Sequence, residues 1–106
     1  MSTRKGRFYE EQAAKYLESQ KWSIIERNVH TPFGEVDLVA LRNKCLCFVE
    51  VKGRRYSSDW SLDAITSSKK RKILLSIEYY IQNVAVDIEY KEMFIGVILI
   101  EGDSLR

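Results

Sequence analysis

Apolar residues recur at helical spacing in two segments of the chain. In residues 7–20 they stand three or four positions apart, which predicts an amphipathic helix with one buried face. That face comprises Tyr9, Ala13, Tyr16 and Leu17. Residues 67–83 repeat the pattern and predict a second helix, with Ser67 or Ser68 as its cap. Its buried stripe comprises Ile73, Leu74, Ile77, Tyr80 and Ile81.

The remaining apolar segments are short and typical of strands. They cover residues 22–28, 35–41, 45–52 and 93–100. The polar link at residues 42–44 predicts a hairpin between the second and third strands. The single proline, in residues 31–34, marks a turn. The last segment is almost entirely apolar, so we expect a strand buried on both faces, and residues 87–90 add an edge segment. The predicted order is α-β-β-β-α-β.

Length and composition predict one globular domain over residues 1–106. The chain is 45% apolar and 30% charged, which disfavours disorder. It has no run of 18 apolar residues and no apolar stretch behind its first charges, so we expect a cytoplasmic protein outside the membrane. Cys45 and Cys47 stand two apart in a strand, a poor geometry for a disulfide, so we expect free thiols. Together with the single histidine, His30, they are too few for a zinc site.

Charge is distributed unevenly along the chain. Residues 1–72 contain 15 basic and 9 acidic residues, a net +6, whereas residues 73–106 contain 2 and 6, a net −4. The positive charge gathers at residues 52–55 and 69–72. A basic half suits a polyanion such as nucleic acid. A solvated charged surface is the alternative explanation.

The hairpin carries the candidate chemistry. If Asn43 and Lys44 are its central turn residues, Asp37 faces Glu50 and Glu35 faces Lys52. Two facing carboxylates repel, and a divalent cation between them would relieve the repulsion. Hard oxygen ligands suit Mg²⁺ or Mn²⁺. Ordinary surface ion pairs are the alternative.

The residues before these charges favour the metal site. Leu46 and Phe48 make an apolar face that Glu50 and Lys52 interrupt, and buried strands do not end in inward charges without a reason. The Glu-x-Lys triplet alone carries no weight, because it also occurs at residues 89–91.

A third carboxylate comes from the first helix. Glu10 shares a face with Ala13, Ala14 and Leu17, so it borders the apolar side, whereas Glu11 points to solvent. Glu10 could therefore reach the sheet. The simpler interpretation is an acid that complements the helix dipole.

Five separated motifs resemble those of the bacterial YraN-like family. They are Gly6-x-x-x-Glu10-x-x-Ala13-x-x-Tyr16-Leu17, Asn28, Gly34-Glu35-Val36-Asp37-Leu38-Val39, Phe48-Val49-Glu50-Val51-Lys52, and Arg54-Arg55. The resemblance covers about residues 6–81. That family is grouped with the restriction-endonuclease-like superfamily of PD-(D/E)xK nucleases, and it is similar to archaeal Holliday-junction resolvases. The chain departs from it at Met93-Phe94-Ile95, where relatives carry Arg-Phe-Asp.

The resemblance implies an α/β fold, an αβββαβ core around a mixed four-stranded sheet flanked by helices. It implies that Asp37 and Glu50 bind Mg²⁺ or Mn²⁺, helped by the backbone carbonyl of Val51. It also implies that Lys52 is the catalytic lysine. Glu10 matches a helical acid that can join the metal site in related nucleases. The role of Glu35 stays open.

The basic residues then become candidates for nucleic-acid binding. We expect Arg54, Arg55, Lys69 and Lys72 to follow the backbone of DNA, with RNA also allowed. Tyr56 and Trp60 either stack on bases or pack the loop. Because junction resolvases act as dimers, the resemblance also suggests a homodimer as one arrangement of this protein.

Three functions fit these observations. The first is a metal-dependent endonuclease that hydrolyses phosphodiester bonds in DNA, including branched DNA. The second is a nucleic-acid-binding or structure-recognising module with little or no cleavage activity. The third is an interaction protein that keeps only the fold.

Overall fold

The predicted order of elements is confirmed. The computed structural model describes residues 4–54, 67–84 and 87–101. Its elements are α1 (Arg4–Ser19), β1 (Ser23–Thr31), β2 (Gly34–Arg42), β3 (Cys45–Arg54), α2 (Ser67–Asn83) and β4 (Glu92–Glu101). Residues 87–90 do not form the expected edge segment.

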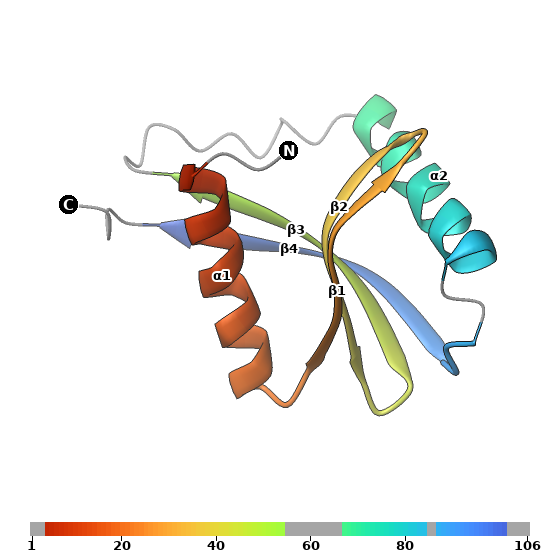
Figure 1. Cartoon of the computed structure of the whole chain (residues 1–106), viewed down its shortest axis with the longest axis horizontal. Coiled ribbons are helices and arrows are strands. Elements are labelled where there is room, and N and C mark those ends of the chain that lie inside the picture. Colours follow the sequence, from red (N-terminus) through yellow and green to blue (C-terminus); the bar gives the residue numbers. More distant parts are fainter. Residues whose placement is uncertain (1–3, 55–66, 85–86, 102–106) are drawn as a thin grey trace.

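The four strands form one mixed sheet in the order β1-β2-β3-β4. β1, β2 and β3 pair antiparallel, whereas β3 and β4 pair parallel. A parallel pair needs a crossover connection, and the chain between β3 and β4 contains α2. The two helices lie on opposite sides of the twisted sheet (Figure 1). This is the mixed four-stranded sheet flanked by helices that the resemblance implies.

The β2–β3 hairpin turns at Asn43 and Lys44, as predicted. Both residues have positive φ, 49° and 64°. A two-residue turn with both central residues in this region matches the right-handed twist of the strands. The paired positions run from Arg42–Cys45 to Leu38–Val49. This register confirms the predicted one over that stretch.

Alternating residues of β3 contribute to two separate hydrophobic cores, one on each face of the sheet. Leu46 and Phe48 are buried with Ile73 and Ile77 of α2, whereas Val49 is buried on the face that α1 covers. The other buried residues of that second cluster are Ala13, Ala14, Leu17, Leu38 and Ala40. Since the side chains of a strand alternate between faces, β3 connects both layers.

The helix faces differ from the prediction at two positions. Leu74 is 53% exposed and Tyr16 is 57% exposed. The buried stripe of α2 centres instead on Ile73, Ser76 and Ile77, because this helix packs on β1, β2 and β3. Leu74 is thus left beside β4, and the pattern alone could not show how far each helix reaches across the sheet.

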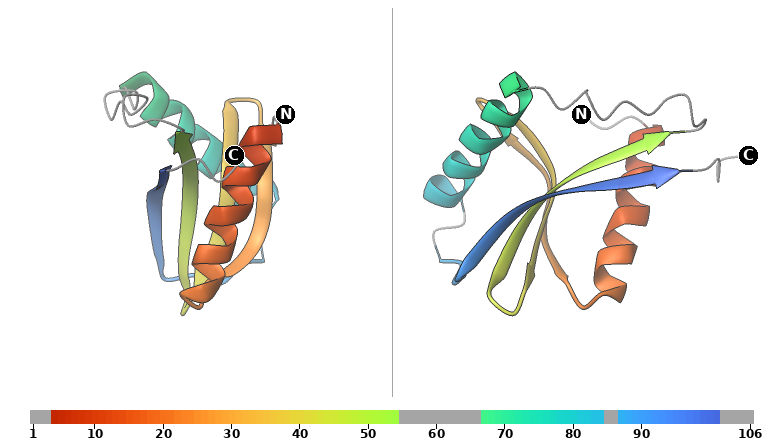
Figure 2. Two further views of the ribbon diagram at one scale, coloured as in Figure 1. Left: turned by 90° about the vertical axis from the view of Figure 1, so that its left-hand side faces the viewer. Right: turned by 180° about the vertical axis from the view of Figure 1, so that it is seen from behind.

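The prediction that the last strand is buried on both faces is wrong. β4 pairs with β3 alone among the described strands and forms an edge of the sheet (Figure 2). Its large apolar side chains remain 40–52% exposed at Met93, Phe94, Ile95, Val97 and Leu99. A continuous apolar run therefore does not distinguish a central strand from an edge strand.

Other details agree with the sequence. The turn at residues 32–33 is present, and the Thr31 hydroxyl oxygen accepts hydrogen bonds from the amides of Phe33 and Gly34. Cys45 and Cys47 are free thiols. Within the described parts of the chain, neither helix is long and apolar enough to span a membrane.

Gly53 allows a close approach of β3 to α1. A Cβ at this position would lie 2.1 Å from the ring of buried Tyr9. We expect Gly53→Ala to lower the free energy of unfolding by about 1–3 kcal/mol, as overpacking does. Gly96→Ala is the control, because its Cβ meets only the Cys47 sulfur, at 3.3 Å. Urea unfolding measures both, and equal stability of Gly53→Ala and wild type would contradict the close approach.

Candidate active site

The site begins where the β2–β3 ladder ends. The last paired position is Leu38–Val49, and the next residue of β2 is Asp37. The Val51 amide donates a hydrogen bond of 2.7 Å to Asp37 Oδ2. A side chain of β2 thus replaces the backbone as a partner of β3, and it holds the Asp37 carboxylate beside the strand that carries Glu50.

Asp37 and Glu50 are carboxylates in an unfavourable place for charge. Both are half-buried, and burial is the largest cause that raises the pKa of each. The negative charge of Asp37 raises the pKa of Glu50 further. The hydrogen bond from Val51 works in the opposite direction on Asp37. Asp37 therefore acts on Glu50 through its charge, whereas the assignment of the two residues as metal ligands stays a prediction.

Two lysines face the carboxylates. The Lys69 ammonium can donate a hydrogen bond to the neutral form of the Lys52 amine, and this interaction is the largest cause that lowers the pKa of Lys52, followed by burial and the charge of Lys69. The positive charges of Lys52 and Lys69 in turn lower the pKa values of Asp37 and Glu50. Lys52 and Lys69 stand 17 positions apart in the chain, and the start of α2 brings them together beside the carboxylates.

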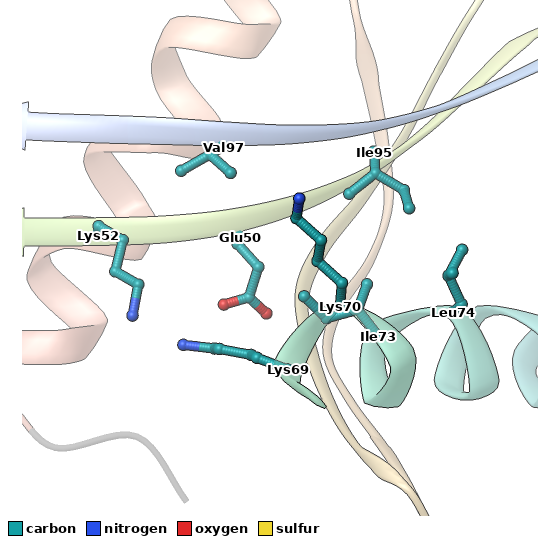
Figure 3. Close-up of a pocket in the computed structure, with 8 residues that line it drawn as sticks. All are labelled: Glu50, Lys52, Lys69, Lys70, Ile73, Leu74, Ile95 and Val97. Carbon is teal, nitrogen blue, oxygen red and sulfur yellow. The ribbon is translucent and has the colours of Figure 1, made fainter. Parts of the chain in front are cut away.

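A pocket of about 340 Å³ opens beside this cluster. Its lining residues are Glu50, Lys52, Lys69, Lys70, Ile73, Leu74, Ile95 and Val97. In Figure 3 the amino groups of Lys52 and Lys69 lie on the same side of β3 as the Glu50 carboxylate, and the apolar side chains of α2 and β4 form the rest of the wall. The pocket is thus charged at one end and apolar at the other.

Sequence reasoning missed Lys70. The signal was available, because Lys70 stands three and four residues before Ile73 and Leu74 and so shares their helix face. Lys72, which was named instead, is exposed on the same helix. The side chain of Arg54 and all of Arg55, Tyr56 and Trp60 lie outside the described residues.

The register does not bring Glu35 to Lys52. The β2–β3 pairing stops before that position, and Glu35 pairs with His30 of β1 instead. The Glu35 Oε1 atom lies 3.0 Å from His30 Nδ1. The charge of Glu35 still raises the pKa values of Asp37 and Glu50.

Glu10 is half-buried on α1, and its inclusion in the site stays a prediction. Its helix packs against the face of β3 that carries Val49, one residue before Glu50. Glu11, by contrast, is exposed as predicted and forms an ion pair with Arg27, 2.7 Å between Nη1 and Oε2.

The donor set fits a magnesium-type ion. In the described part of the chain, no group of three His, Cys, Asp or Glu side chains could hold a metal ion. Magnesium, however, is usually bound through one or two carboxylates and completes its shell with water and substrate phosphates. Asp37 and Glu50 supply such a pair of oxygen ligands, and their raised pKa values reflect the electrostatic strain that a cation would relieve.

Comparison with known proteins shows the family of this chain. The model of the family described as "Uncharacterised protein family UPF0102" matches residues 9–100. The chain belongs to the UPF0102 family. The match runs from α1 to β4 and contains Glu10, Asp37, Glu50 and Lys52, and it confirms the resemblance to the YraN-like family.

Curated UPF0102 proteins from several bacteria are similar to the chain. A UPF0102 protein of Syntrophotalea carbinolica is 41% identical over 83 residues, which cover 77% of this chain and 68% of the relative. A UPF0102 protein of Campylobacter fetus is 38% identical over 98 residues, covering 92% and 83%. One of Aliarcobacter butzleri is 36% identical over 107 residues, covering 100% and 94%. These similarities establish the family.

The strain at the carboxylates predicts a stability change. A raised carboxyl pKa means that the folded protein holds the proton more tightly than the unfolded chain, so this stabilisation is lost as the pH rises through the folded pKa. Glu50→Gln cannot ionise. We expect it to be more stable than wild type at pH 7, with the difference closing below about pH 4.

Thermal unfolding across this pH range measures the effect. Glu78→Gln, at an exposed position of α2, is the control for the change in net charge. If both variants gained the same stability at pH 7, burial and repulsion at Glu50 would not be the cause of the gain.

Proposed function

We propose that this protein is a Mg²⁺- or Mn²⁺-dependent endonuclease that hydrolyses phosphodiester bonds in DNA. The observation that carries the proposal is the pair of half-buried, mutually repelling carboxylates at the end of the β2–β3 ladder, with two lysines beside it. A purely structural ion-pair cluster has no need to bring Asp37 and Glu50 together. The resemblance to PD-(D/E)xK nucleases assigns catalysis to the same positions.

Each group has a role in such a reaction. Asp37, Glu50 and the backbone carbonyl of Val51 would hold the cation, with Glu10 as a further candidate ligand. The cation would polarise the phosphate and lower the pKa of a bound water. Lys52 would orient that water or stabilise the negative charge that develops on the phosphate. Because its pKa is lowered by Lys69 and by burial, Lys52 gives up a proton at Nζ more readily than an ordinary lysine.

The substrate class follows from charge. Lys69 and Lys70 line the pocket beside Glu50, at a helix start that favours phosphate. Arg54, Arg55 and Lys72 would extend this surface along a nucleic-acid backbone. Residues 1–72 carry the net positive charge, which supports a polyanionic partner. The similarity to junction resolvases favours DNA, branched DNA included.

A binding module with little cleavage is the second candidate. It is favoured by one observation: in the described part of the chain no three candidate ligands gather to hold a metal ion, and lysines already oppose the charge of Asp37 and Glu50. Such a cluster could present Lys52 and Lys69 to phosphate without turnover.

A cleavage assay distinguishes the two functions. Labelled duplex, flap, four-way-junction and single-stranded DNA would be incubated with Mg²⁺, Mn²⁺ or EDTA. The endonuclease should cut at least one substrate with metal only. Asp37→Asn and Lys52→Ala should lower the rate by about 100-fold or more, and Asp37→Asn should keep its affinity for DNA.

The second Glu-x-Lys triplet offers a matched control. Glu89→Gln and Lys91→Ala repeat these chemical changes at exposed positions and should cut like wild type. Salt-sensitive binding without cleavage by the wild type would favour the binding module. Equal rates for Lys52→Ala and Lys91→Ala would overturn the assigned site.

A further inference from the structure

β4 presents an uninterrupted apolar edge. Residues 93–100 contain no charged residue, no proline and a single glycine. Edge strands are normally protected by charges, prolines, bulges or a covering element, because an open edge pairs with other chains. In the described residues β4 has β3 on one side alone, and between its terminal Glu92 and Glu101 it carries no charged residue and no proline. Among the described residues, this edge is therefore open to pairing with another strand.

The apolar surface continues from the strand onto both helices. On the side of α2, the pocket wall joins Leu74 to Ile95 and Val97. On the side of α1, a second groove joins exposed Tyr16 to residues 97–100. The two grooves meet at β4, which lies at the edge of the sheet in Figure 2, and both are lined by Val97. We call this apolar region the β4 surface, comprising Tyr16, Leu74, Met93, Phe94, Ile95, Val97 and Leu99.

We propose that a second copy of this chain covers the β4 surface and makes a two-fold dimer. The size of the surface fits this occupant. Its seven side chains are each 40–57% exposed, so the apolar area is on the order of 600 Å² per copy, against about 800 Å² per partner in a standard interface. With a polar rim added, the surface is large enough for a stable dimer.

The charge of the strand favours a second copy over nucleic acid as the occupant of the β4 surface. The strand itself offers no cation, and residues 73–106, which include α2 from Ile73 onward and β4, carry a net charge of −4. A polyanion gains little along the strand itself, since the cations of the neighbouring pocket, Lys52, Lys69 and Lys70, belong to β3 and to the start of α2. A second copy brings the same apolar residues 93–100, and in a two-fold interface identical patches meet, so this stretch of the strand brings no charge into the interface.

The backbone also favours a protein strand. An edge strand offers a row of amide and carbonyl groups that another strand can satisfy, whereas apolar ligands cannot. Two copies of β4 lying side by side would satisfy these groups in both chains at once. The inference does not rest on the proposed nuclease activity, because it concerns assembly of the free protein.

Sedimentation equilibrium of the full chain tests the dimer, without DNA or metal. We expect wild type to have twice the mass of one chain across a dilution series. Ile95→Glu should sediment as a monomer, because a charge in the apolar interface would lose its water. Val84→Glu is the matched control, an equally exposed apolar residue that lies outside the β4 surface, and it should remain a dimer.

Circular dichroism checks that the variants still fold. Ile95 is 46% exposed in one copy, at the apolar end of the pocket, so Ile95→Glu should keep the wild-type spectrum, and Ile95→Lys provides a second charged variant if it does not. A monomeric wild type, or a dimer that survives both substitutions, would overturn the proposal. A monomeric wild type whose Ile95→Glu variant loses affinity for DNA would assign the surface to nucleic acid instead.

Discussion

Two carboxylates share a half-buried position at the end of a strand ladder, and the arrangement of the site depends on their repulsion. Burial disfavours the charged form of Asp37 and of Glu50, and the charge of Asp37 adds to the cost at Glu50. The Val51 amide and the lysines offset part of that cost. Such unresolved strain is typical of sites that bind a cation, where the ion completes the balance.

The fold makes this pairing possible because β3 belongs to two cores. Leu46 and Phe48 fix the strand against α2, and Val49 fixes it against α1. The close approach at Gly53 holds the end of the strand next to α1. Glu50 and Lys52 therefore extend from a strand held on both sides, which is the rigidity that positioned chemistry needs.

Local signals in the sequence predicted most of the fold. The two-residue turn at Asn43 fixed the hairpin register, and alternation along β3 separated the two faces. The coupling of Asp37 with Glu50 followed from these. The predictions that were wrong depended on how the elements pack in three dimensions. Because α2 does not extend over β4, Leu74 and the large apolar side chains of β4 are exposed. Because the β2–β3 ladder ends before Glu35, this residue pairs with His30 and not with Lys52. No local pattern encodes where a helix stops covering a sheet or where two strands part.

Calorimetric titration with Mn²⁺ tests the central claim most directly, because it reads the carboxylate pair without substrate. The account predicts one ion per chain for the wild type, binding lost in Asp37→Asn and in Glu50→Gln, and binding unchanged in Glu89→Gln. No binding by the wild type, or equal binding by all four proteins, would contradict a cation site at Asp37 and Glu50.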